Sequence, residues 1–227
     1  MIAKQQMFDR IRGALGSKGA DVALPTPARF EIVDNGSLAD RFCRELSLVG
    51  GNAHRIAPYA KLETFIEKLL PVGESCSVAL SDGCAIRDSG LREWLTNSGI
   101  EVLSTLSDSQ TSQKDYVRKL LDARIGVTQA DYAIAETGTL VLISGAEQHR
   151  LLSLVPPVHV CLLYARQIVP SLGSLLTRLE QRFATGDITP QAVTMITGPS
   201  RTADIEHTLT MGVHGPLALH VLISETV

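Results

Sequence analysis

Short apolar segments alternate with amphipathic helical segments along most of the chain, and this alternation constrains the fold more than any other feature. Strand-like segments cover 53–57, 77–80 and 100–104, and segments with helical periodicity cover 61–70, 90–97 and 113–123. Before them, Ser37 can cap a helix that Gly50-Gly51 ends. Strands that alternate with helices are joined by right-handed crossovers into parallel sheets. The sequence therefore predicts an α/β fold with a mostly parallel open sheet and flanking helices.

The stretch GVTQADYAIAETGTLVLIS, residues 126–144, interrupts this alternation. It has two apolar, β-rich halves on either side of Glu136-Thr137-Gly138, with no room between them for a crossover helix. We therefore expect an antiparallel hairpin inserted into the parallel order. A strand over 158–164 and a helix over 170–183 follow it.

The first 35 residues differ from the rest of the chain. Apolar residues recur at helical spacing over 4–15, which predicts a small amphipathic helix. Residues 17–35 contain Pro25 and Pro27 and few periodic apolar residues, which is typical of an extended linker. We therefore predict an N-terminal helical arm and linker over 1–35 and one α/β domain over 36–227.

Composition and charge argue against several kinds of partner. The formal charge is -3, from 21 basic and 24 acidic side chains, and aromatic residues make up only 4%, so no nucleic-acid surface is expected. No apolar run approaches the roughly 20 residues of a membrane span, and the N-terminus lacks the apolar core of a secretory signal. A cytoplasmic location is therefore expected.

The sequence contains no signature of a bound cofactor or metal ion. The motifs G-x-G-x-x-G, G-x-x-x-x-G-K-[ST] and G-x-S-x-G are absent, and the histidines show no metal-ligand spacing. We therefore predict no metal site and no cofactor bound by this chain. The cysteines form neither a C-x-x-C pair nor a ferredoxin-type run, and we expect them to be reduced and mostly structural; they are Cys43, Cys76, Cys84 and Cys161.

The segment ITGPSRTADIEHTLTMGVHGP, residues 196–216, is the richest in candidate binding groups. A strand over 192–197, expected to be buried on both faces, ends at Gly198-Pro199. A short acidic helix is then expected between the capping hydroxyls of Ser200 or Thr202 and Gly212. A second turn over 213–216 leads to a last strand over 217–223.

Two readings of this segment are open. Gly198-Pro199-Ser200 either presents backbone N–H groups to a phosphate or carboxylate or forms a plain capped turn, in which Pro199 removes one donor. Asp204 and Glu206 are explained more simply by the dipole of the expected helix than by acid–base chemistry.

Ligands in open α/β sheets bind at the carboxyl ends of strands, near a switch in strand order. Residues 197–204 are expected to lie at one such end, and Ser81-Asp82-Gly83 at another. Polar groups from loops that are distant in sequence are therefore expected to meet at this edge of the sheet.

Four further positions carry candidate chemistry. Glu136 at the hairpin turn is either exposed and idle or held in a cleft, and Thr137 and Thr139 either satisfy the turn or bind a ligand. Arg150 can grip a carboxylate with its planar guanidinium, although surface arginines are commoner. His214 can move a proton near neutral pH or serve only its turn.

Four segments together resemble the signature blocks of the LUD domain family: ADYAIAETGTLVL (130–142), RLLSLVP (150–156), TGPSRTADIE (197–206) and GVHGP (212–216). More narrowly, the chain resembles the lactate utilization protein C branch, and the resemblance covers essentially its whole length. The resemblance implies a fold similar to that of ribose-5-phosphate isomerase, glucosamine-6-phosphate deaminase and the CoA transferases.

The same resemblance implies a role in oxidising L-lactate to pyruvate together with separate iron-sulfur partner subunits. Removing two electrons from a 2-hydroxy acid requires an acceptor that side chains cannot provide. Because the sequence shows no binding signature for one, iron-sulfur clusters are expected in the partner subunits.

Three hypotheses follow. In the first, the chain is a subunit of a lactate-oxidising complex, and its cleft binds a small carboxylate or a partner. In the second, it is a stand-alone isomerase or an acyl or CoA transferase, with Glu136 as base or nucleophile and His214 as acid. In the third, it is a scaffold or regulatory protein. The expected cleft lies between the hairpin and the segment 196–216. Its expected ligand-binding residues are Thr137, Gly138, Thr139, Arg150, Gly198, Pro199, Ser200, Arg201, Thr202, Asp204, Glu206 and Gly215.

Overall fold

The computed structural model describes residues 2–15, 36–56, 62–71, 76–104, 113–145, 148–184, 192–203 and 209–225. The chain divides into two compact units, residues 1–33 and 34–227. The first contains helix α1 (Ile2–Leu15), on which the apolar side chains of Met7, Phe8 and Ile11 are exposed. This helix includes the one expected over 4–15, whereas the linker expected over 17–35 lies outside the described residues.

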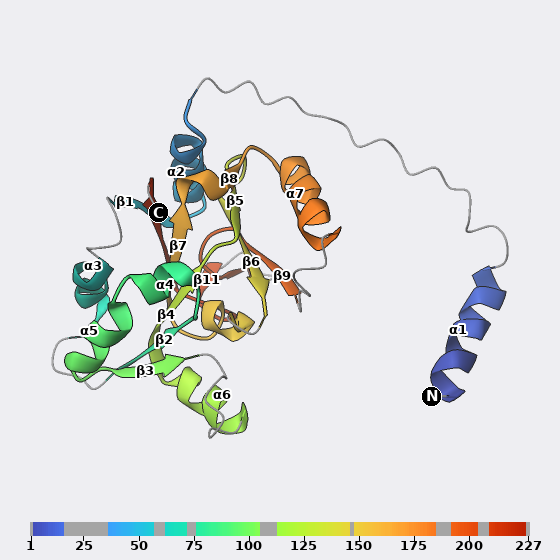
Figure 1. Cartoon of the computed structure of the whole chain (residues 1–227), viewed down its shortest axis with the longest axis horizontal. Helices are drawn as coiled ribbons and strands as arrows, with labels where there is room; N and C mark the ends of the chain where they lie inside the picture. Colours follow the sequence, from blue (N-terminus) through green and yellow to red (C-terminus); the bar gives the residue numbers. More distant parts are fainter. Residues whose placement is uncertain are drawn as a thin grey trace. The chain divides into compact units, whose positions relative to one another are not determined.

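The second unit is built on a sheet of six strands, all paired in parallel (Figure 1). Its inner strands are rich in apolar residues that are buried on both faces, as crossover helices require. The α/β class with a mostly parallel sheet is therefore confirmed. Across the sheet the strands are β1 (Asn52–Ile56), β12 (Ala218–Ser224), β7 (Val158–Tyr164), β4 (Ala123–Gln129), β2 (Ser77–Leu80) and β3 (Glu101–Ser104).

Helices cover both faces of this sheet (Figure 1). The first face packs in one apolar cluster against α3 (Leu62–Leu69), α4 (Cys84–Asp88) and α5 (Leu91–Asn97). The second face packs against α2 (Leu38–Leu48), α6 (Gln113–Leu121) and the 3-10 helix η3 (Arg150–Ser153). Ser37 caps α2 as expected, because its hydroxyl accepts a hydrogen bond from the Ala39 N–H.

A smaller sheet of four strands lies over the second face of the central sheet and shares an apolar cluster with it. In order, its strands are β8 (Ile168–Val169), β5 (Tyr132–Ile134), β6 (Thr139–Ser144) and β9 (Ala192–Ile196), and the short helix η4 (Ala165–Gln167) precedes β8. β5 and β6 form the expected antiparallel hairpin. The helix α7 (Leu172–Ala184) packs on the other face of this sheet.

Three expectations differ from the structure. Residues 123–129 form the central strand β4, so only β5 and β6 make the hairpin. The strand over 192–196 is alternately half-buried and exposed, because it is the last strand of the smaller sheet and pairs antiparallel with β6. In place of the short acidic helix, β10 (Arg201–Ala203) and β11 (Leu209–Met211) form an antiparallel ribbon.

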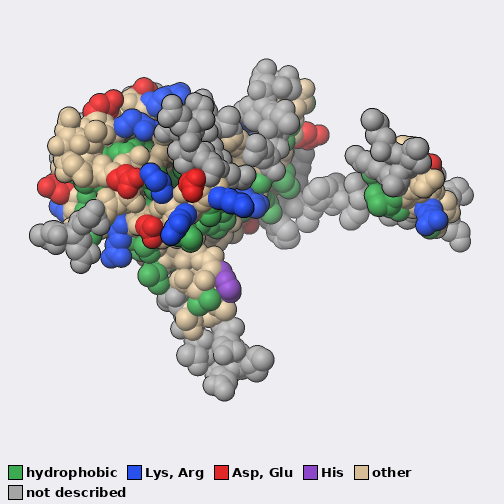
Figure 2. Space-filling view, turned by 90° about the horizontal axis from the view of Figure 1, so that it is seen from below, with side chains coloured by type: hydrophobic (Ala, Val, Ile, Leu, Met, Phe, Trp, Pro, Cys, Tyr) green, Lys and Arg blue, Asp and Glu red, His purple; other side chains and the backbone are tan. Residues whose placement is uncertain are grey.

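The described surface agrees with the even balance of charges. Basic and acidic side chains are interspersed over the larger part of the face shown in Figure 2. None of the helices in the described residues is both long enough and apolar enough to cross a membrane.

Candidate functional site

The strand order places a topological switch between the neighbouring strands β2 and β4. From β2 the chain continues to β3 on one side, and from β4 it continues to β7 on the other. The connections therefore leave the carboxyl ends of β2 and β4 in opposite directions, and open α/β sheets commonly hold ligands at such a point. Ser81-Asp82-Gly83 follows β2 at this edge, and Ala130-Asp131 follows β4.

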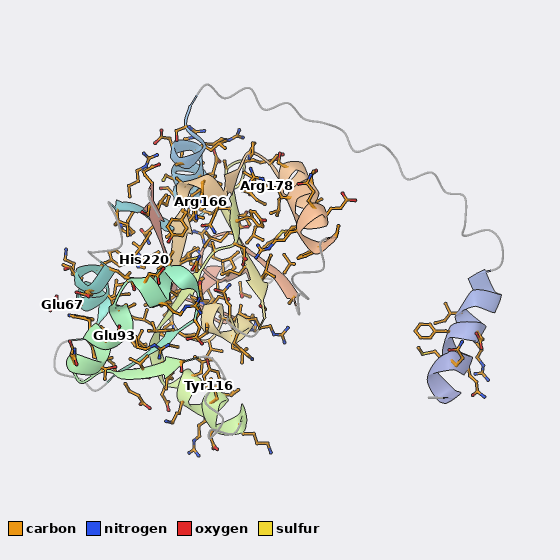
Figure 3. The ribbon with its side chains drawn as sticks, in the orientation of Figure 1. Glu67, Glu93, Tyr116, Arg166, Arg178 and His220 are labelled. Carbon is orange, nitrogen blue, oxygen red and sulfur yellow. The ribbon has the colours of Figure 1, made fainter. Side chains whose placement is uncertain are left out.

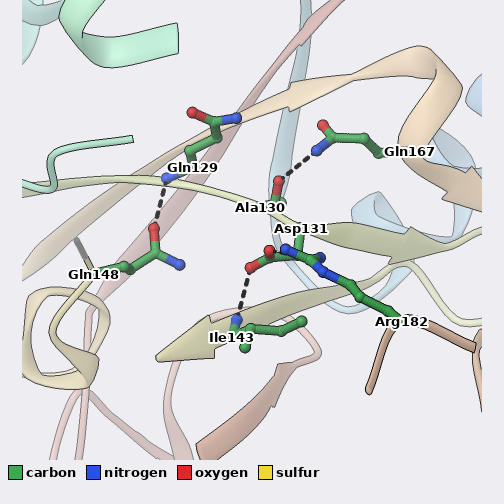
Figure 4. Close-up of polar contacts among 7 residues, drawn as sticks. All are labelled: Gln129, Ala130, Asp131, Ile143, Gln148, Gln167 and Arg182. Carbon is green, nitrogen blue, oxygen red and sulfur yellow. Dashed lines mark hydrogen bonds and ion pairs between the residues drawn. The ribbon is translucent and has the colours of Figure 1, made fainter. Parts of the chain in front are cut away.

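Gln129 ties the end of β4 to its surroundings (Figure 4). Its side-chain oxygen Oε1 accepts a hydrogen bond of 3.0 Å from the Ala85 N–H, and its own N–H donates to Oε1 of Gln148 over 3.1 Å. A Cβ on Gly83 would lie 2.6 Å from Oε1 of Gln129, so a larger residue there would displace the Gln129 side chain from Ala85. These bonds hold the loops after β2 and β4 in a defined arrangement.

Asp131 fastens the same edge to the smaller sheet and to α7 (Figure 4). Its carboxylate accepts hydrogen bonds from the Ile143 N–H at 2.7 Å and from Nη1 of Arg182 at 2.9 Å. Burial raises the pKa of Asp131, and these two donors oppose that rise. Beside it, Nε2 of Gln167 donates to the carbonyl oxygen of Ala130 over 2.8 Å. The groups of this network are paired with one another, so we assign it a structural role.

Near the end of β2 lie an ion pair and two buried hydroxyls, which are not part of the network around Gln129 and Asp131. Asp82 forms an ion pair of 3.0 Å with Arg92 of α5. Tyr116 of α6, labelled in Figure 3, is 5% exposed, and burial together with the charge of Asp82 raises its pKa to about 12. Its ring meets the ring of His149 edge-on, with centroids 6.1 Å apart. Within the described residues, neither the Tyr116 hydroxyl nor the fully buried Ser81 hydroxyl has a hydrogen-bond partner.

A buried hydroxyl–imidazole pair lies next to Ser81. Leu80 is paired with Val127 across the two strands, so the residues that follow them, Ser81 and Thr128, are neighbours. Oγ1 of Thr128 lies 2.8 Å from Nε2 of His159 in β7. Burial lowers the pKa of His159 to about 3, so its imidazole is neutral at physiological pH. Its Nδ1 atom has no hydrogen-bond partner.

The predicted residues at the hairpin turn lie elsewhere, beside α2 and α7. Oε2 of Glu136 accepts a 3.3 Å hydrogen bond from the Leu172 N–H at the start of α7. The hydroxyls of Thr137 and Thr139 are 2.6 Å apart, and that of Thr139 lies 2.7 Å from the hydroxyl of Thr197 at the end of β9. The hydroxyls thus join the hairpin turn to the start of the segment 197–206.

The turn at Gly198 packs against the carboxyl end of α2. Gly198 has φ +85°, and a Cβ there would lie 2.6 Å from the carbonyl oxygen of Val49. Next to it, a Cβ on Gly50 would collide with Nη2 of Arg201 and would lie 3.8 Å from Cγ of Pro199. Both predicted turns therefore come together on α2, in direct contact with its backbone.

The second Gly-Pro turn closes back onto Ser200. The Ser200 N–H donates to the carbonyl oxygen of Pro216 at 2.9 Å, and its own carbonyl accepts from the Gly212 N–H at 3.0 Å. A Cβ on Gly215 would lie 3.1 Å from Cβ of Ser200, and His214 beside it is exposed.

The other predicted ligand-binding residues lie apart from these turns or outside the described chain. Thr202 belongs to the ribbon, where it is paired with Thr210. Arg150 is exposed at the start of η3. Asp204 and Glu206 lie outside the described residues.

Most of the polar groups at the β2–β4 edge were not predicted from the sequence. Only Ser81-Asp82-Gly83 was placed there. The available signals were single polar residues inside otherwise apolar strands, such as Gln129 in GVTQ and His159 in VHVCLLY. Tyr116 gave no signal, because an aromatic residue on the apolar face of a helix is the usual core pattern.

The described cysteines lie on separate elements. Cys43 is in α2, Cys76 precedes β2 and Cys161 is in β7, where burial raises its pKa to about 12. In the part of the chain that the structure describes, no three His, Cys, Asp or Glu side chains gather as a metal ion would need.

Comparisons with known proteins find relatives over nearly the whole chain. The lactate utilization protein C of Halalkalibacterium halodurans is 32% identical over 223 residues, which is 97% of this chain and 94% of that protein. The protein of the same name from Bacillus subtilis is 35% identical over 113 residues, covering 49% of this chain and 47% of its own length. An uncharacterized protein of Escherichia coli, YkgG, is 34% identical over 66% of this chain and 63% of its own length.

A solved structure shares the fold. The crystal structure of a DUF162 family protein from Deinococcus radiodurans matches 82% of this chain and 96% of its own with a TM-score of 0.56 and 25% sequence identity. The model of the LUD domain matches residues 39–224, a span that includes every strand of the central and smaller sheets. By this match and by the relatives that share its length, the chain belongs to the LUD domain family.

Proposed function

We propose that this chain is a component of the oxidation of L-lactate to pyruvate and that it acts with separate iron-sulfur subunits. The observation that carries the proposal is the match to a lactate utilization protein C over 97% of the chain. A role in lactate utilisation fits that relationship. Because the oxidation needs a two-electron acceptor, the proposal assigns electron transfer to the partner subunits and ligand or partner binding to this chain.

Arg150 is the proposed anchor for a carboxylate or for an acidic group of a partner. It begins η3, next to His149, whose pKa is lowered by burial and by the charge of Arg150. The His149 ring contacts Tyr116 at one end of η3, and just beyond the other end the Leu154 carbonyl oxygen lies near Gly215. The helix η3 therefore reaches from the β2–β4 edge toward the second Gly-Pro turn, with Arg150 exposed at its first residue. We propose that Ser200, which bonds to that turn, and Thr202 of the ribbon supply hydroxyl donors.

Growth of a deletion strain tests the role in lactate oxidation. A strain that lacks the gene is expected to grow on pyruvate but not on L-lactate, and the wild-type gene is expected to restore growth. Arg150→Met is expected to restore it poorly, whereas Arg124→Met, which removes another exposed arginine, should restore it fully. Normal growth of the deletion strain on L-lactate would contradict the proposal.

The partner subunits need a separate test. A tagged chain purified from cells grown on L-lactate is expected to co-elute with iron and acid-labile sulfide in a fixed ratio to the chain. Elution of the tagged chain without iron, from cells in which lactate oxidation is active, would refute the iron-sulfur partners and leave the growth result untouched.

A further inference from the structure

Among the described residues, four buried polar atoms without hydrogen-bond partners lie on the second face of the central sheet or on the smaller sheet that covers this face. They are Oγ of Ser81, Oη of Tyr116, Oγ of Ser144 and Nδ1 of His159. Side chains two residues apart on a strand share a face. Ser81 therefore shares a face with Ala79, and Ala79 lies in the same apolar cluster as Tyr116. His159 shares a face with Cys161, and Cys161 lies in the same apolar cluster as Leu142. Leu142 and Ser144 are two residues apart on one strand, so Ser144 lies on the side of His159.

Such atoms are unusual, because more than nine in ten buried polar groups in proteins find a partner. Leaving one unpaired is unfavourable, because the group loses its hydrogen bonds to water and gains none in the protein. Four of them, three of which are on the face of the central sheet at the topological switch, point to partners outside the described part of the chain. The partner is either a ligand or ordered water.

The chemistry of the edge favours a ligand with a carboxylate. The Ser81 and Tyr116 hydroxyls are hydrogen-bond donors, and with its pKa at about 12 Tyr116 keeps its proton at neutral pH. The exposed Arg150 follows His149, which contacts Tyr116, and brings positive charge to this edge. The negative charge of Asp82, which acts on Tyr116, is offset by its ion pair with Arg92. Nδ1 of the neutral His159 can donate to a keto oxygen or, in the other tautomer, accept from a hydroxyl, whereas the Asp82 carboxylate can only accept from a hydroxyl.

We propose that the carboxyl ends of β2 and β4 hold a short 2-hydroxy or 2-oxo monocarboxylate, whose carboxylate accepts hydrogen bonds from the hydroxyls of Ser81 and Tyr116. The choice of a 2-hydroxy or 2-oxo acid rests on the proposed function, whereas the carboxylate site rests on the unpartnered hydroxyls. Asp82 and Arg92 form its charged rim, and the Thr128–His159 pair lies below it.

Calorimetric titration of the full chain tests this site. The probes are L-lactate, pyruvate, acetate and inorganic phosphate, and the variants are Ser81→Ala and Tyr116→Phe. Each substitution removes one hydroxyl and nothing else, so each variant is expected to bind L-lactate or pyruvate about tenfold more weakly than the wild type. Without ligand, both variants should melt at the wild-type temperature or slightly above, because an unpaired buried hydroxyl is lost. Tyr132→Phe, in the smaller sheet, is the control and should bind like the wild type.

The outcomes separate this site from the proposed function. If no carboxylate gives a binding signal in the titration, or if all variants bind with the affinity of the wild type, the site is overturned. Ordered water is then the partner of these hydroxyls. Binding of acetate that depends on Ser81 and Tyr116, without binding of L-lactate or pyruvate, keeps the carboxylate site and overturns its assignment to lactate.

Discussion

Gly138 lies at the tip of the β5–β6 hairpin with φ +63°, and a Cβ there would collide with the backbone nitrogen of Leu46 in α2. Gly138→Ala is therefore expected to lower the free energy of unfolding by about 2–4 kcal/mol, from left-handed strain and displacement of α2 together. Urea denaturation of both proteins measures the difference.

Gly90 provides the control for Gly138, because it has φ +71° and no atom within 4 Å of an added Cβ. Gly90→Ala should cost only the strain of the left-handed backbone, about 1 kcal/mol. Equal effects of the two substitutions would show that the hairpin does not depend on its contact with α2.

His159 makes the stability depend on pH. Its pKa is about 6.5 in the unfolded chain and about 3 in the folded protein, so the neutral form is favoured by folding. This contribution is complete above pH 6.5 and is lost as the pH falls toward 3, by at most about 1.4 kcal/mol per pH unit. The lowered pKa values of His54 and His220 act in the same direction.

Urea denaturation at pH 7.5, 6.0 and 5.0 tests the effect of His159. His159→Gln removes the titrating group, so its unfolding free energy should fall less steeply than that of the wild type over this range. Equally steep curves for the two proteins would contradict the buried, neutral imidazole.

At the level of elements, hydrophobic periodicity predicted most helices and central strands. Each of these elements spans only 4 to 14 consecutive residues, so the pattern that forms it is contained in a short stretch of sequence. β10 and β11 escaped prediction, since each has three residues and is held by pairing with the other across residues 204–208. Ser200 and Thr202 suit a strand as well as a helix cap, and only the pairing decides between them. Ser81-Asp82-Gly83 was placed at the edge of β2 and β4, but the contacts of Gln129 there were missed for the same reason, because Gln129 meets Ala85 across 44 positions.

Apolar contacts, the Glu136–Leu172 hydrogen bond and a partly buried ion pair between Arg182 and Asp131 attach α7 to the smaller sheet. Arg182→Met would leave the Asp131 carboxylate with only the Ile143 N–H as its described partner, so we expect a loss of about 1–3 kcal/mol in unfolding free energy. Adding Asp131→Asn should recover part of it, because the buried charge is then removed. Thermal and urea denaturation of the single and double variants measure this coupling.

An exposed ion pair is the control for this prediction. Lys119 and Glu101 are 3.1 Å apart, with side chains 54% and 57% exposed. Lys119→Met should change the unfolding free energy by less than about 0.5 kcal/mol. If Arg182→Met lowered the unfolding free energy as little as Lys119→Met, the apolar contacts of α7 would be what attaches it to the smaller sheet.

For the α/β unit as a whole, the two faces of the central sheet are expected to unfold together. The β-strands of the sheet contribute side chains to the apolar clusters on both faces, so neither cluster keeps its shape when the sheet is lost. Trp94, the single tryptophan, packs against the cluster on the first face and reports on that face alone. Leu140 of the smaller sheet is fully buried in the cluster on the second face.

Leu140→Ala therefore tests cooperativity across the sheet. It should lower the unfolding free energy by about 2–5 kcal/mol, and the transition seen by Trp94 fluorescence should shift together with that seen by circular dichroism. Leu154→Ala, at a position 38% exposed, should cost less than about 1 kcal/mol. If the Trp94 transition stayed in place while circular dichroism shifted, the smaller sheet would be a separate folding unit, and a ligand at the β2–β4 edge would stabilise only the central sheet.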